Sequence, residues 1–82
     1  MAGKIGVVTH YYDRIGVASV KLSALLRAGD KIKVKGKNSE LNQDVVSIQF
    51  EHNNIDKGTK GQEIGLKVNQ PVKENDVVYK VA

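Results

Sequence analysis

The sequence predicts an all-β protein: a small, closed, six-stranded antiparallel barrel that forms one domain over residues 1–82. Three observations predict this fold. Apolar residues alternate with polar ones over most of the chain, which is the period of strands with one buried face. The alternating segments are short and are separated by Gly, Asn and Asp, which tolerate the backbone of tight turns. The length is enough for one modest core.

Six segments carry the alternation. They are residues 4–9, 17–22, 31–35, 46–51, 64–68 and 77–81. In the first five, the period predicts one face for each of these sets: Ile5, Val7 and Thr9; Ala18, Val20 and Leu22; Ile32 and Val34; Val46, Ile48 and Phe50; Ile64, Leu66 and Val68. The last segment contains three valines, so the pattern does not determine which of its faces points inward.

The connections between these segments contain residues typical of turns. Gly16 ends the first hairpin loop, and residues 36–42 are expected to form a longer polar loop. Pro71 falls before the last strand, where its missing N–H donor is harmless. The spacing of Leu22, Leu25 and Leu26 is the one helical hint, but it covers less than two turns, so we interpret it as a turn or a single helical twist.

Two distant stretches resemble each other. Residues 26–32 and 72–78 each begin with an apolar residue, continue with Gly29 or Asn75, and then place Asp30 or Asp76 before a strand. Glycine and asparagine both adopt positive φ. The pattern predicts the same turn at two places in the fold.

Composition excludes several classes of protein. The chain has no cysteine, so disulfides and thiolate metal sites are excluded, and a reducing, cytoplasmic location is expected. It shows no signal peptide and no apolar run long enough to span a membrane, so we expect a soluble protein without membrane contact. Thirteen Lys and Arg against nine Asp and Glu give a net charge of +4, which favours anionic partners such as RNA.

The order of several short motifs resembles a known family. The motifs are Gly6-Val7-Val8, Gly16-Val17-Ala18, residues 26–34 (LRAGDKIKV), 45–49 (VVSIQ) and 60–66 (KGQEIGL), and Asn75-Asp76-Val77-Val78. Together, from Lys4 to Val81, they resemble the β-barrel second domain of elongation factor Tu and related translation GTPases. Two positions depart from that pattern: Asn75 replaces the usual glycine, and the loop at Ser23-Ala24-Leu25 lacks a glycine often found there.

The resemblance implies a binding module. The chain has neither a phosphate-binding Gly-x-x-x-x-Gly-Lys-Ser/Thr motif nor an Asn-Lys-x-Asp motif, so GTP hydrolysis is not implied. The family's barrel faces small-subunit ribosomal RNA and, in elongation factor Tu, helps to hold the aminoacyl end of tRNA. A similar barrel closes the C-terminus of some collagenase-like peptidases linked to RNA modification, where it is an accessory module. These are expectations by analogy of fold.

A row of basic residues is the first candidate site. Lys31, Lys33, Lys35 and Lys37 recur at a spacing of two, with Arg27 just before them. On a strand they would project from one face at a spacing of about 7 Å, comparable to successive phosphates of a nucleic acid. The alternative is a solubilised outer face or a strand edge protected from pairing.

The first hairpin tip is the second candidate site. Tyr11, Tyr12 and Arg14 stand there together and could stack on exposed bases. The alternative is that the tyrosines pack over an open end of the barrel with their hydroxyls in water.

Catalytic and metal sites are not expected. His10 and His52 have no spacing typical of metal ligands, and no serine lies in a Gly-x-Ser-x-Gly elbow. The segment Gly58-Thr59-Lys60-Gly61 is glycine-rich, but it precedes a predicted strand and not a helix, so we interpret it as a plain turn. The sequence predicts no enzyme, no cofactor and no metal.

The leading functional hypothesis is a non-catalytic, translation-related module that binds RNA or the ribosome through the basic face. The second hypothesis is a protein-interaction adaptor that docks onto a separately encoded enzyme or GTPase. A salt-sensitive affinity for RNA would favour the first, and salt-tolerant association with a protein would favour the second. The sequence does not determine an oligomeric state.

Overall fold

Ten antiparallel strands build the computed structural model, which describes residues 3–37, 40–51 and 53–81. The strands are β1 (Gly3–Tyr12), β2 (Val17–Leu22), β3 (Leu26–Arg27), β4 (Lys31–Lys35), β5 (Glu40–Asp44), β6 (Ile48–Phe50), β7 (Asn53–Ile55), β8 (Lys57–Gly58), β9 (Glu63–Lys67) and β10 (Val77–Val81). The all-β prediction is therefore confirmed, and the described residues contain no helix. Among them, no helix is long and apolar enough to cross a membrane.

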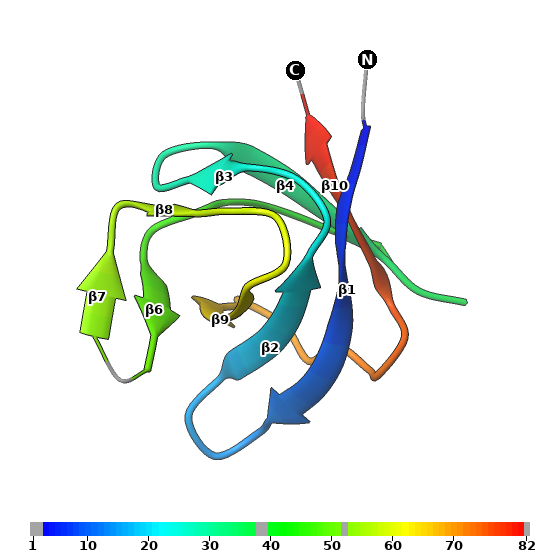
Figure 1. Ribbon diagram of the computed structural model, residues 1–82. Coiled ribbons are helices and arrows are strands. Elements are labelled where there is room, and N and C mark those ends of the chain that lie inside the picture. The colour runs from blue at the N-terminus through cyan, green and yellow to red at the C-terminus, as the bar shows by residue number, and fades with distance from the viewer. Residues whose placement is uncertain (1–2, 38–39, 52, 82) are drawn as a thin grey trace.

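Eight of the strands form one curved sheet. Their order is β5-β4-β10-β1-β2-β9-β6-β7, and β3 pairs with β8 in a separate two-stranded sheet. The long hairpin β1–β2 crosses the centre of the molecule, and β10 runs beside β1 at the other side of that strand (Figure 1). The pairing of β10 with β4 then brings the end of the chain next to residues 31–35.

The prediction of a closed six-stranded barrel is wrong, because among the described residues the sheet ends at β5 and β7 without a ladder between them. A side chain bridges part of the opening. Gln43 on β5 donates from Nε2 to the carbonyl of Lys67 at 2.7 Å, and its Oε1 accepts from the backbone N–H of Asn69 at 2.9 Å. The side-chain amide thus takes the place of a strand's backbone amide, since it offers the same donor and acceptor.

One apolar cluster fills the inside of the curved sheet. The residues predicted to face inward on β2 and β4, on β9 and just after it at Val68, are all buried, which confirms the alternation in these strands. They are Ala18, Val20, Leu22, Ile32, Val34, Ile64, Leu66 and Val68. On β10 the alternation left the inward face open, and the buried residue is Val78.

The alternation fails in β1 because the strand contains irregularities. Its register shifts between Lys4 and Gly6 against β10, and between Val8 and His10 against β2. An extra residue at a bulge reverses the direction of every later side chain. Ile5 and Val8 are therefore the buried apolar side chains of β1, and the prediction that Val7 and Thr9 share the face of Ile5 is wrong.

The predicted fourth strand is also displaced. Val46 was expected inside but is 79% exposed, and Val45 is buried in its place. Val45 N donates to Asp30 O and Gly29 N donates to Val45 O, both at 2.7 Å. These two bonds fix Val45 against the start of β4, so the regular strand begins only at Ile48.

Three turns of the same design lead into β4, β9 and β10. In each, the backbone N–H of the fourth residue donates to the first residue's carbonyl at 3.1 Å, and the fourth side chain accepts from the first residue's N–H at 2.8–2.9 Å. The turns are residues 27–30, 59–62 and 73–76. Their third residues, Gly29, Gly61 and Asn75, have φ of 95°, 93° and 73°. The predicted likeness of the first and third turns is confirmed, as is the plain turn after Gly58.

Candidate functional site

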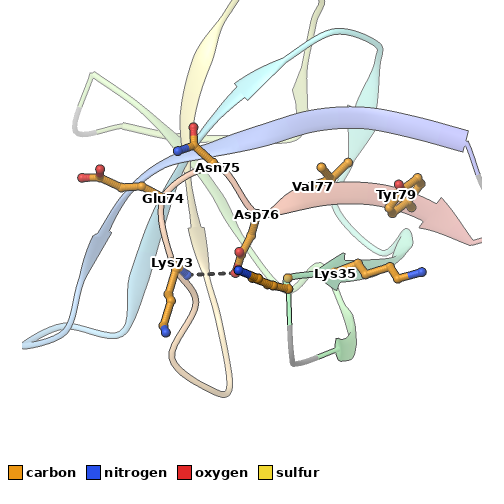
Figure 2. Close-up of a pocket in the computed structure, with 9 residues that line it drawn as sticks. Lys35, Lys73, Glu74, Asn75, Asp76, Val77 and Tyr79 are labelled. Carbon is orange, nitrogen blue, oxygen red and sulfur yellow. Dashed lines mark hydrogen bonds between the residues drawn. The ribbon is translucent and has the colours of Figure 1, made fainter.

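The largest concavity of the described residues lies where β4 ends beside the start of β10. It has a volume of about 710 Å³ and is lined by residues 35–37, by the turn 73–76, and by Val77 and Tyr79. We call it the basic bowl. The segments are distant in sequence, and the antiparallel pairing of Lys35 with Val77 brings them together. Figure 2 shows the turn 73–76 crossing beside the end of β4, with Asp76 between the two.

Asp76 organises the wall of the basic bowl. It is only 8% exposed, and its Oδ2 accepts from the backbone N–H of Lys73 at 2.9 Å (Figure 2). A Cβ at position 36 would lie 2.8 Å from Asp76 Oδ1, so the close approach of the two segments requires Gly36. The backbone N–H of Lys73 thus fixes the carboxylate by a hydrogen bond, and Gly36 leaves space for it because glycine has no side chain.

Three lysines line the basic bowl together with this carboxylate. Lys35, Lys37 and Lys73 are exposed, and none forms an ion pair within the part of the chain that the structure describes. Glu74 also lines the bowl, and its Oε1 lies 3.3 Å from His10 Nδ1. In the view of Figure 2, the ammonium groups of Lys35 and Lys73 lie on different sides of Asp76. The bowl therefore presents separated positive charges around an acceptor group.

The predicted basic row is only partly continuous in the structure. Lys31, Lys33 and Lys35 do share one face of β4, because Ile32 and Val34 between them are buried. Lys33, however, is paired with Glu40 at 3.4 Å.

The other two members of that row separate from it. Lys37 lies beyond the end of β4 and contributes to the basic bowl. Arg27 lies on β3, in the second sheet, where it is opposite Lys57. Of the five residues in the predicted basic face, only Lys35 and Lys37 line the bowl.

The predicted hairpin site also lies apart from the basic bowl. Tyr11 is half-buried and packs against the core, whereas Tyr12 is 48% exposed with its ring edge against His10, at a centroid distance of 4.4 Å. Arg14 lies in the exposed turn that joins β1 to β2. The packing of Tyr11 agrees with the alternative reading, in which a tyrosine beside a turn covers the end of the core.

A second, smaller depression lies on the outer face of β2, β9 and β6. It measures about 240 Å³ and is lined by Ile15, Val17, Ser47, Gln49, Gly65 and Lys67. Ile15 is 59% exposed. Its lining mixes apolar and polar side chains, and Lys67 is the one titratable group among these six residues.

The described residues contain no group of three or more His, Cys, Asp or Glu side chains placed to hold a metal ion. His52, which was considered as a metal ligand and rejected, lies outside the described residues. The sequence reading missed Lys73, Asp76 and Tyr79 as parts of the main concavity. The repeated turn motif was the available signal for the first two, since it placed them in a defined turn before β10.

The chain is similar to proteins named as proteases. It is 36% identical over 77 residues to an uncharacterized protease of Methanocaldococcus jannaschii, and 33% identical over 78 residues to a collagenase of Porphyromonas gingivalis. The matches cover 93% of this chain but 19% and 22% of those proteins, so the chain spans about a fifth of the length of the curated relatives it matches. No family model matches the sequence.

The structure is similar to a domain of the same kind of protein. The C-terminal domain of a candidate U32 peptidase from Geobacillus thermoleovorans superimposes with a TM-score of 0.90 and 25% identity, over 95% of this chain and 91% of that domain. Its selenomethionine variant gives a TM-score of 0.88 at 24% identity. The similarity therefore extends to nearly the whole of that C-terminal domain.

These comparisons correct the family that the sequence reading named. The identification with the second domain of elongation factor Tu is wrong, because the relatives are U32 peptidase and collagenase proteins and the similar structure is a U32 C-terminal domain. That identification was based on short turn and strand motifs. The structure uses one of those turns three times to lead into strands, so such motifs report the architecture and do not identify a translation factor.

The expectation of a translation-related module that binds RNA or the ribosome is overturned with it. The proposed RNA contacts of Arg27, Lys31, Lys33, Lys35, Lys37, Tyr11, Tyr12 and Arg14 lose that basis. In the structure, Arg27 lies in the second sheet and Lys33 is paired with Glu40. The alternative, a protein-interaction adaptor that docks onto a separately encoded enzyme or GTPase, has no support in the relatives either.

Proposed function

We propose that residues 1–82 form one accessory domain of the kind found at the C-terminus of U32 peptidases, and that the domain itself does not cleave peptide bonds. The carrying observation is the similarity to the Geobacillus C-terminal domain, with a TM-score of 0.90 over 91% of that domain. Sequence similarity to a protease and a collagenase supports the same class. A cytoplasmic location remains our expectation from the composition.

A polypeptide is the ligand that suits such a domain. In the relatives, the matching segment accounts for about a fifth of the protein, so four fifths of the chain remains for catalysis and other tasks. An accessory domain contributes by binding substrate or by holding another part of its own protein in place. The basic bowl is the surface we assign to binding, because it is the largest concavity of the described residues and carries charged groups around its edge.

A domain exchange tests this proposal. The segment of the Porphyromonas collagenase that matches this chain is deleted, or is replaced by residues 1–82, and collagen cleavage is compared with that of the parent. We expect deletion to lower the activity, the exchanged protein to recover it, and the 82-residue chain alone to be inactive. Circular dichroism shows whether each protein is folded. Cleavage by the 82-residue chain alone, or a folded exchange protein no more active than the deletion, would refute the proposal.

A further inference from the structure

We propose that the basic bowl binds an acidic segment of polypeptide, with Lys35 and Lys73 contacting its carboxylates. This inference rests on the proposed function, because the relatives are proteases and polypeptide is the material they handle. It adds a ligand class and named contacts, which the comparisons do not give.

Charge is the first argument. Two other lysines already have partners: half-buried Lys33 pairs with Glu40, and exposed Lys80 pairs with Asp30, each at 3.4 Å. Lys35 and Lys73 have no such carboxylate among the described residues. Two unpaired cations at one concavity attract an anionic ligand and raise its local concentration.

Shape is the second argument. A volume of about 710 Å³ is far more than one carboxylate or one small ion fills. The ammonium groups of Lys35 and Lys73 lie on different sides of Asp76 in Figure 2, so they do not converge on a single point. An extended ligand with two or more negative groups can contact both, whereas a compact anion contacts one.

The residues that line the bowl also favour a peptide over a polyphosphate as its ligand. Asp76 lines the bowl. Its Oδ1 has no hydrogen-bond partner among the described residues, and solvent can reach this atom. Such an oxygen accepts from the N–H groups of a peptide but repels phosphate oxygens. Val77 and Tyr79 add half-buried apolar surface on which side chains of a peptide can pack.

Fluorescence anisotropy with two labelled octapeptides tests the inference. One alternates glutamate with alanine, and its control carries glutamine in place of glutamate. We expect the folded 82-residue chain to bind the acidic peptide and not the control, with an affinity that falls as salt is added. Failure of the acidic peptide to bind at millimolar concentration would overturn the inference.

A pair of double variants assigns the site. Lys35→Gln with Lys73→Gln should weaken binding about fivefold or more, since two charged contacts are lost. Lys21→Gln with Lys60→Gln removes the same charge from exposed positions outside the bowl, and should change affinity less than about twofold. Thermal unfolding checks that both variants fold. Equal losses in the two variants would overturn the assignment, because binding would then follow net charge alone.

A polyphosphate probe of matched charge separates the ligand classes. Tighter binding of polyphosphate through Lys35 and Lys73 would overturn the choice of a peptide. These results are independent of the domain exchange: if the exchanged collagenase is active but the acidic peptide does not bind, only this inference fails. If the peptide binds but the exchanged protein is inactive, the proposed function fails.

Discussion

Replacing Asp76 by alanine should strongly lower the free energy of unfolding, although this residue lines a surface concavity. The substitution removes the acceptor of the 2.9 Å bond from Lys73 N–H in the turn that leads into β10. Hydrogen bonds to charged groups contribute about 1.5–3 kcal/mol, and Asp76 is 8% exposed, so water restores only part of the loss. We expect a cost of about 2 kcal/mol.

This cost is large for a chain of 82 residues, whose total stability is about 4–12 kcal/mol at typical values per residue. For a domain of this size, 1 kcal/mol lowers the melting temperature by about 4–8 °C, so Asp76→Ala should lower it by about 8–16 °C. Urea unfolding followed by circular dichroism measures the free energy directly, because small domains unfold in one step.

Gln62 provides the matched comparison. Its Oε1 accepts the equivalent bond, from Thr59 N–H at 2.8 Å, but it is a neutral amide. Gln62→Ala should cost about 1 kcal/mol, the usual net value of a neutral hydrogen bond. Asp76→Asn keeps a neutral acceptor and should cost about 1 kcal/mol, the difference between a bond to a charged group and a bond to a neutral one. If Asp76→Ala destabilises no more than Gln62→Ala, the reasoning from charge and burial is refuted.

Three further substitutions test other parts of the structure. Gln43→Ala removes the bridge from β5 to backbone groups of residues 67–69 and should cost about 1 kcal/mol in urea unfolding; no change would mean that the bridge is not stabilising. Gly36→Ala places a Cβ 2.8 Å from Asp76 Oδ1 and should cost about 1–3 kcal/mol, with weaker binding of the acidic peptide; an unchanged melting temperature would contradict the close approach. Glu51 has a φ of 52°, so Glu51→Gly should raise stability by about 0.5 kcal/mol, and a loss would contradict the strain argument.

The sequence predicted the strands whose apolar period is unbroken. In β2, β4 and β9, every second residue is apolar and buried, so the pattern alone places them. Residues 36–42 were predicted to form a polar loop, but residues 40–42 belong to β5, in which Leu41 is the one buried residue of five. Strand β5 forms because its backbone pairs with β4, and not because its side chains are mostly apolar. Pairing of this kind is tertiary information that the local pattern does not contain.

The same limit explains the candidate site. Lys35 was named from its spacing along β4, but Lys73 lies 38 residues later in a turn that shares no local pattern with it. The two meet only because β10 pairs with β4 and not with another strand. The helical spacing of the leucines fails for a related reason: Leu26 is buried within β3, opposite Gly58, while Leu25 is 39% exposed. Non-local partners decide both cases.

The three equivalent turns show why only one of them forms part of a candidate site. The carboxylate of Asp30 lies 3.4 Å from Lys80, and its backbone carbonyl accepts from Val45, so that turn is held by neighbours. The turn at Gln62 presents a neutral amide. At Asp76 the facing residue is Gly36, which contributes no side chain and leaves a concavity in front of a charged group. The turn itself is an architectural element, and the absence of a side chain opposite it creates the basic bowl.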